Sequence, residues 1–148
     1  MLAVSGGVAE LEGIVGVTDY SSRVQAVADW FGPVDFAKII PLKENFREYY
    51  QAAGQLLGGV GAKLEENSDK IYKANPIAYI SSDDPPFLIM HGIADTVVPI
   101  AQSRELSAAL KKQNVKVDYY EFANEGHDLS KPEYLQTALR FFDKYLKK

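Results

Sequence analysis

The sequence is poor in the residues that build metal and disulfide sites: its 148 positions include no cysteine and two histidines. Without cysteine, disulfides and thiolate metal ligands are excluded. The two histidines are far apart and have no H-x-x-x-H spacing, so a metal-dependent enzyme has no evident ligand set. We therefore expect neither a metal nor another cofactor.

Basic clusters and long apolar runs are also missing. The net charge is −4 and no dense Lys/Arg cluster occurs, which argues against a nucleic-acid partner. No apolar run approaches the roughly 18 residues of a membrane helix, and "MLAVSGG" lacks the basic region of an export signal. We expect a cytoplasmic protein that does not contact a membrane.

The composition is that of an ordinary globular chain, with 47% apolar and 24% charged residues, and we expect one domain over residues 1–148. The pattern predicts strands at 23–31, 87–91 and 115–123 and helices at 99–114 and from 130 onward, with a helical insertion at 36–75. Strands that alternate with helices in this way predict an α/β fold with a mainly parallel sheet.

Two of these elements have more specific patterns. The strand at 87–91 is apolar without interruption, which is typical of a strand covered on both faces. The last helix opens with "SKPE", where Ser130 and Glu133 have capping-box spacing. Its residues Leu135, Leu139, Phe142 and Leu146 share one face, which we expect to carry the apolar contacts of the helix.

A carboxylate and an imidazole follow successive predicted strands. Asp95 lies four residues after the strand that ends at His91, and His127 lies five residues after Phe122. Adjacent parallel strands are about 4.8 Å apart, so loops at their carboxyl ends can bring such side chains together. A carboxylate bonded to one ring nitrogen fixes the tautomer and leaves the other nitrogen free to accept a proton. The pair therefore predicts a general base.

Plainer interpretations exist for each residue. An aspartate after a strand is often a cap or turn residue, and a histidine in "EGHD" is often part of a turn. The placement of Asp95 and His127 on successive strand ends favours the functional interpretation. His91 closes an apolar strand, so we expect a packed structural role for it. Asp128 is adjacent to His127 in the sequence and is therefore badly placed to replace Asp95.

Three segments resemble a known family: "SSRVQAVADWFGPVDF", "PPFLIMHGIADTVVP" and "YEFANEGHDL". Together they are similar to the C-terminal half of α/β-hydrolase esterases, in the group of lipase-like, feruloyl and acetyl-xylan esterases. The resemblance implies that Asp95 is the acid and His127 the base of a Ser-His-Asp triad. It also implies that 36–75 forms a small cap over an acyl pocket whose wall includes Trp30 and Phe31.

The family's nucleophile motif, G-x-S-x-G, does not occur in this sequence, although in that family the serine precedes both other triad members. The stretch "MLAVSGGVAELEG" resembles the end of the helix that follows the serine. We expect a loop or cap role for the serines that remain in irregular stretches, which are Ser5, Ser21, Ser22, Ser81, Ser82 and Ser130.

Two functions stay open at this point. The chain is either part of a carboxylic-ester hydrolase that receives its serine from a missing segment or another chain, or a catalytically inactive truncated hydrolase that binds itself or a partner. In relatives the strand at 23–31 is internal. A bare apolar edge is a template for another chain, so we expect a homodimer through residues 24–30.

Overall fold

The computed structural model describes residues 1–13 and 19–147, and its centre is a parallel sheet of three strands. The strands are β1 (Val27–Trp30), β2 (Phe87–Gly92) and β3 (Val117–Phe122), in the spatial order β1-β2-β3. Val27 is in register with Phe87, which in turn is in register with Val117. The predicted α/β class and parallel sheet are confirmed, while the first strand is shorter than the predicted 23–31.

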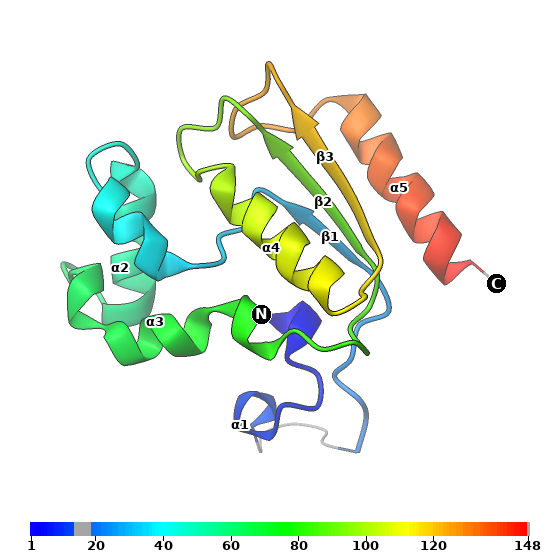
Figure 1. The fold of residues 1–148 in the computed structure, drawn as a ribbon, viewed down its shortest axis with the longest axis horizontal. Helices are drawn as coiled ribbons and strands as arrows, with labels where there is room; N and C mark the ends of the chain where they lie inside the picture. Colours follow the sequence, from blue (N-terminus) through cyan, green and yellow to red (C-terminus); the bar gives the residue numbers. More distant parts are fainter. Residues whose placement is uncertain (14–18, 148) are drawn as a thin grey trace.

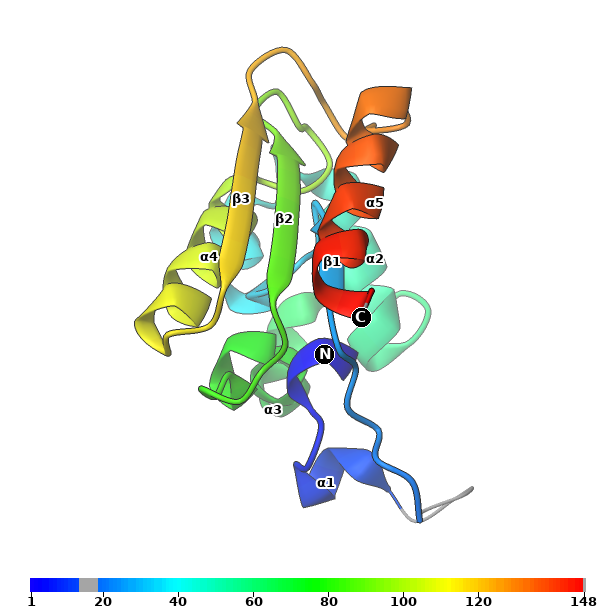
Figure 2. The ribbon, with the colours of Figure 1, turned by 90° about the vertical axis from the view of Figure 1, so that its right-hand side faces the viewer.

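The sheet lies between two helices (Figures 1 and 2), α4 (Ala101–Lys112) on one face and α5 (Pro132–Leu146) on the other. All six residues of β2 are buried, as its uninterrupted apolar sequence predicts. Its side chains alternate between two cores. Phe87 and Ile89 pack with Leu106 and Leu110 of α4, whereas Leu88 and Met90 pack on the other face against the core residues Leu129, Tyr134, Ala138 and Phe141.

The segment between β1 and β2 is helical, as predicted for 36–75, and stands beside the sheet in Figure 1. It contains α2 (Arg47–Gly58) and α3 (Ser68–Ala74), together with 3-10 helices at Phe36–Leu42, Leu64–Glu66 and Pro76–Tyr79. Its own core includes Ile39, Ala53 and Leu64, and this core extends to Val98 in the loop after β2. The insertion therefore packs against the loop that carries Asp95.

Gln102 connects α4 to the start of this insertion. Its side chain is 2% exposed, and its Oε1 accepts hydrogen bonds from the backbone N–H groups of Val34 at 2.9 Å and Asp35 at 2.8 Å. Buried backbone donors need partners, so this amide satisfies two groups that would otherwise be orphaned. The loop that leaves β1 is thereby tied to the first turn of α4.

Helix α5 departs from the sequence prediction at its start. Its N-cap residue is Lys131 and Pro132 is the first helical residue, so Ser130 and Glu133 do not form the predicted capping box. The reason is steric, because the residue before a proline is pushed out of the helical region. Lys131 accordingly has extended backbone angles, and Pro132 takes the first-turn position that suits it.

The predicted apolar face of α5 is wrong for its three leucines, whereas Phe142, its fourth member, packs in part against the core. Leu135, Leu139 and Leu146 are 51%, 47% and 47% exposed, while the helix buries Tyr134, Ala138 and Phe141 against the sheet. The helix carries two adjacent apolar stripes, and docking onto the sheet uses the aromatic one. The leucine stripe is left on the outer surface of the described chain.

The first residues form a 3-10 turn, Leu2–Val4, and the short helix α1 (Ala9–Glu12), both near the amino ends of the strands (Figures 1 and 2). Val4 joins the core on the α4 face. Among the helices described, none has both the length and the apolar character needed to span a bilayer.

Candidate active site

Asp95 and His127 meet at the carboxyl end of the sheet, in the loops that follow β2 and β3. The Nδ1 atom of His127 lies 2.8 Å from Oδ2 of Asp95, although 32 positions separate the residues in sequence. The carboxylate side chain has no exposed surface, whereas the imidazole is 34% exposed. A buried acid thus holds a base that solvent, or a substrate, can reach.

The loop after β2 fixes the Asp95 carboxylate through its other oxygen. Oδ1 accepts hydrogen bonds from the backbone N–H groups of Val97 at 2.7 Å and Val98 at 2.9 Å. An aspartate that bonds the backbone two residues ahead forms an Asx turn, which suits the short "ADTVV" loop. The turn anchors Oδ1, so Oδ2 remains aimed at the imidazole.

His91 is a third member of this group. It is fully buried, and its Nε2 lies 3.0 Å from the carbonyl oxygen of Val98 and 3.2 Å from Oδ2 of Asp95. A carbonyl only accepts, so Nε2 carries the proton, and Nδ1 faces the hydroxyl of Ser103 at 2.7 Å. Burial lowers the pKa of His91, and the bonds to Val98 and Asp95 oppose that effect only in part.

The prediction for His91 was therefore incomplete. The residue is packed, as expected, but it also donates toward the oxygen that accepts from His127. The signal in the sequence is its spacing of four from Asp95, in "HGIAD", across a turn that brings the chain back on itself.

The loop that carries His127 is held against the end of β2 by backbone contacts. The N–H of Ala94 donates to the carbonyl oxygen of Glu125 at 3.0 Å, and the N–H of Ile93 donates to that of Phe122 at 2.9 Å. This approach requires glycine at position 92, because a Cβ there would lie 2.2 Å from the Glu125 oxygen. Asp128 turns away from the imidazole, since its Oδ1 accepts the N–H of Ser130 at 2.8 Å.

The two predicted pocket-wall residues lie in different surroundings. The ring of Phe31 is next to His127, with centroids 4.1 Å apart and planes inclined by 41°. Trp30 packs with the core on the α5 face of the sheet, and among the described residues its Nε1 has no hydrogen-bond partner although it is buried. Phe31 thus lies next to the pair formed by Asp95 and His127, called the dyad below. Trp30 lies beside it at the edge strand.

Three of the serines predicted to have loop or cap roles make hydrogen bonds away from the site. Ser5 ends the first 3-10 turn and reaches the carbonyl of Leu2, Ser22 bonds Glu12, and Ser81 bonds Asp83. Within the described residues no hydrogen bond joins a serine hydroxyl to His127. The 3-10 turn that precedes Ser5 lies at the opposite end of the sheet from the dyad (Figure 1).

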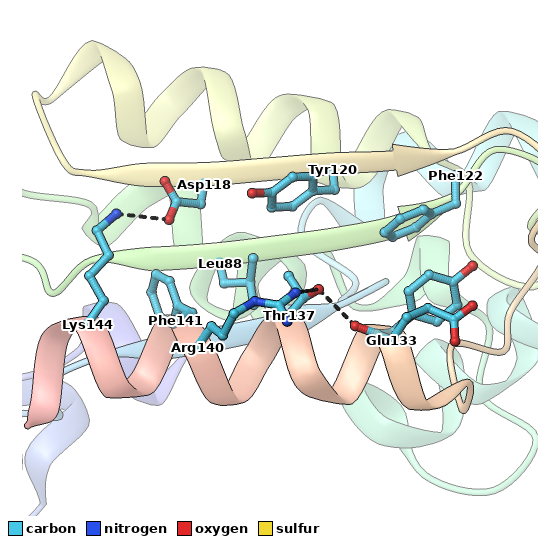
Figure 3. A pocket seen from close by; sticks show the side chains of 10 residues that line it. Leu88, Asp118, Tyr120, Phe122, Glu133, Thr137, Arg140, Phe141 and Lys144 are labelled. Atoms are coloured by element: carbon cyan, nitrogen blue, oxygen red, sulfur yellow. Dashed lines mark hydrogen bonds and ion pairs between the residues drawn. The ribbon is translucent and has the colours of Figure 1, made fainter.

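A separate hollow of about 460 Å³ lies between β3 and α5 (Figure 3). It has an aromatic side formed by Tyr120 and Phe122, and Lys144 pairs with Asp118 at 3.3 Å at one end. Neither Asp95 nor His127 lines it. Because the hollow lies on the α5 side of the sheet, it is separate from the contact between Asp95 and His127 at the carboxyl ends of the strands.

The arrangement at the strand tips can move a proton. Asp95 holds the proton of His127 on Nδ1, which leaves the lone pair on Nε2 to accept one. The imidazolium that results is stabilised by the same buried carboxylate. The pair lies at the carboxyl ends of the strands, where ligands bind in open α/β sheets.

The parallel sheet, with a contact between a carboxylate and an imidazole in the loops after its last two strands, is part of an α/β-hydrolase fold of the esterase type, as comparisons with known proteins show. The chain belongs to the BD-FAE family, whose model matches residues 1–110. It is 32% identical over 113 residues to the esterase LipQ of Mycobacterium tuberculosis, in a match that covers 76% of this chain and 26% of LipQ.

Solved structures give the same result. A truncated form of a carbohydrate esterase from gut microbiota superposes with a TM-score of 0.76 at 28% identity, covering 97% of this chain and 53% of that one. A bifunctional GH43-CE protein of Bacteroides eggerthii also gives 0.76, at 30% identity, covering 97% of this chain and 21% of that one. The chain therefore spans between about a fifth and a half of these relatives.

Proposed function

We propose that the chain supplies the acid and base of a serine carboxylic-ester hydrolase, with Asp95 as the acid and His127 as the base. The observation that carries the proposal is the 2.8 Å contact between Asp95 Oδ2 and His127 Nδ1 at the carboxyl ends of adjacent parallel strands. The nucleophile is a serine outside these 148 residues, in a missing segment or another chain.

In this reaction Nε2 of His127 takes the proton from the serine hydroxyl as its oxygen attacks the ester carbonyl. The resulting imidazolium returns that proton to the alkoxy oxygen as the carbon–oxygen bond breaks, and the alcohol leaves. His127 then takes a proton from a water, whose oxygen attacks the acyl carbon of the acyl-serine. The imidazolium returns this proton to the serine oxygen as the acyl–serine bond breaks, and the carboxylic acid product leaves. Asp95 keeps the proton on Nδ1 throughout and balances the charge on the ring.

The substrate class is a small acyl or aryl ester, and the descriptions of the related carbohydrate esterases favour an acyl group carried on a saccharide. Phe31 would form the wall beside the imidazole, and Trp30 would extend it toward the free edge of β1. The helical insertion at 36–75 would act as a cap, since its core reaches Val98 next to the acid loop.

Substitutions at the dyad test this function in the isolated chain, where the dyad can activate only water. We expect slow hydrolysis of p-nitrophenyl acetate that falls equally in His127→Ala and Asp95→Asn, by up to about 10²–10⁴-fold, the usual contribution of a general base. The amide in Asp95→Asn presents an N–H to His127, which forces the proton onto Nε2 and removes the base. Initial rates at matched protein concentration measure the effect.

Asp128→Asn is the matched control, because this carboxylate is next to His127 but bonds the backbone of Ser130. A rate that is absent, or that is the same in all three variants, would contradict the proposal. A fluorophosphonate probe gives a second check. We expect it to leave the serines of this chain unlabelled, and an adduct on any of them would place the nucleophile inside the chain.

A second candidate function is that of a self-associating module, and the free edge of β1 favours it. In the described residues β1 pairs only with β2. The N–H groups of Val27 and Phe31 donate to Pro86 and Met90, so at the two-residue period of a strand those of Ala28 and Trp30 point away from the sheet. We propose that this edge of β1 pairs with the β1 edge of a second copy of the chain.

We expect the chain to sediment as a dimer at micromolar concentration and Ala28→Pro to sediment as a monomer. Proline removes the outward N–H of residue 28 without removing a bond to β2, and it is tolerated on edge strands for that reason. Asp29→Pro is the contrasting variant, since its N–H points toward β2, and it should unfold rather than dissociate. A wild-type chain that sediments as a monomer would contradict this candidate.

A further inference from the structure

Phe31 has an unusual backbone conformation for its residue type. Its φ is 47°, and Asn114 is the only other non-glycine residue with positive φ among those described. Asparagine tolerates this left-handed region, whereas a bulky aromatic residue does so only where its surroundings impose it. Such outliers cluster at functional sites, so the surroundings of Phe31 need an explanation.

The turn around Phe31 is fixed on both sides. Its N–H donates to the carbonyl oxygen of Met90 at 3.0 Å, which continues the ladder between β1 and β2. The next residue is Gly32, where a Cβ would lie only 2.1 Å from Oδ1 of Asp29. Two residues further on, Gln102 binds the N–H of Val34 at 2.9 Å. The chain therefore has little freedom to place Phe31 elsewhere.

The ring that this turn presents touches both imidazoles of the site. It lies over His127 at a centroid distance of 4.1 Å and meets His91 edge-on at 6.2 Å, with the planes inclined by 80°. These two histidines contact the same oxygen of Asp95. A tilted aromatic contact of this kind restricts the orientation of a ring. The His127 ring needs that restriction, because its only described hydrogen bond is the one from Nδ1.

We propose that Phe31 is a positioning residue that clamps the face of the His127 imidazole, so that Nδ1 stays on Asp95 and Nε2 points out of the site. The strained turn is what brings the ring to this place. The proposal rests on the proposed function for its catalytic meaning. The contact itself can be tested without any ester.

The test uses the fact that the chain has only two histidines, so an imidazole ¹⁵N spectrum contains two residues. In the wild-type chain we expect His127 as a single tautomer with the proton on Nδ1. In Phe31→Leu and Phe31→Gly we expect a mixture of tautomers and exchange of the Nδ1 proton with water that is roughly two- to twelve-fold faster, the range that corresponds to one aromatic pair.

The variants separate the ring from the backbone. Glycine adopts positive φ readily, so Phe31→Gly keeps the turn and removes the clamp. Phe31→Tyr keeps the ring and should restore the wild-type spectrum. Phe142→Leu alters an aromatic residue of α5, away from the dyad, and should leave His127 unchanged.

The proposal would be overturned if His127 kept its wild-type tautomer and its wild-type Nδ1 proton exchange rate in both Phe31→Leu and Phe31→Gly. The proposal would also be overturned if Phe31→Tyr lost the single Nδ1-protonated tautomer of His127 while its melting temperature stayed unchanged. Failure of the proposed function is distinguishable, because it would remove ester hydrolysis and leave these spectra as expected. If the clamp is wrong, the contact between His127 and Asp95 is still expected. Asp95→Asn is then still expected to lower ester hydrolysis.

Discussion

Gly92→Ala is expected to separate His127 from Asp95 and to destabilise the chain by about 3 kcal/mol, at the upper end for an overpacked core position. The new Cβ would lie 2.2 Å from the Glu125 carbonyl oxygen, 2.4 Å from that of Gly126 and 2.5 Å from the Glu125 carbonyl carbon. All three are backbone atoms, so no side chain can rotate to make room. The loop must move away from β2.

That movement has a direct consequence for the site. The loop is held by the bond from Ala94 N–H to the Glu125 oxygen, and His127 follows two residues later. A displacement of about 1 Å would take the imidazole out of hydrogen-bonding range of Asp95. We expect thermal unfolding to show the lost stability and the ¹⁵N spectrum of His127 to show a loss of the fixed tautomer.

Gly126→Ala is the matched control in the same loop. Its Cβ would meet the carbonyl oxygen of Ala94 at 3.7 Å, an ordinary contact, and Gly126 is not among the residues with positive φ. It should therefore keep both the stability and the tautomer. Equal behaviour of Gly92→Ala and Gly126→Ala would contradict the role that the structure gives to Gly92.

The sequence was sufficient to predict the contact between Asp95 and His127, because strand order and strand tips follow from patterns of apolar residues and loops. The contact between His91 and the Asp95 carboxylate was not predictable in the same way. His91 belongs to a buried strand, and only the return of the "IADTVV" loop brings Val98 and Asp95 to its Nε2. The clamp by Phe31 was equally hidden, since a residue's sequence neighbours do not reveal positive φ.

Helix α5 shows where a periodic pattern fails. Leucine and aromatic stripes run side by side on it, one residue apart, and both satisfy the spacing of an apolar helix face. In the structure the buried residues are Tyr134, Ala138 and Phe141, which share a core with Leu88 and Met90 of β2. The ring of Tyr134 also packs against that of Phe122 of β3, with centroids 4.5 Å apart. The leucine stripe stayed exposed. Pattern alone gives the width of an apolar arc, and tertiary packing decides which part of it is buried.

Asp29→Asn is expected to stabilise the chain at neutral pH and to have no effect in acid. Asp29 lies in β1, and its Oδ2 is buried without a hydrogen-bond partner among the described residues. Burial raises the pKa of this carboxyl from 3.8 to about 6, and the N–H of Gly32 opposes the rise only in part. An uncharged amide of the same shape avoids the cost of burying a charge.

The direction of the pH dependence follows from that raised pKa. The folded chain binds the proton of Asp29 more tightly than the unfolded chain, so the stability it contributes is complete below about pH 3.8 and is lost as the pH rises to about 6. The difference corresponds to about 3 kcal/mol, since one pKa unit is about 1.4 kcal/mol. Denaturant unfolding at pH 4 and pH 7.5 should show Asp29→Asn gaining its advantage only at the higher pH.

Asp83→Asn provides a control of opposite sign. The hydrogen bond from the Ser81 hydroxyl and the charge of Arg23 lower the pKa of the Asp83 carboxyl, so its ionised form favours the folded state. Removal of this charge should destabilise the chain at pH 7.5. Equal stability of Asp29→Asn and wild type at pH 7.5 would show that the Asp29 carboxylate has found a partner. Asp29 is packed against Gly32, where a Cβ would lie 2.1 Å from the Asp29 Oδ1 atom. Such a partner would therefore have to enter the turn that places Phe31 next to His127.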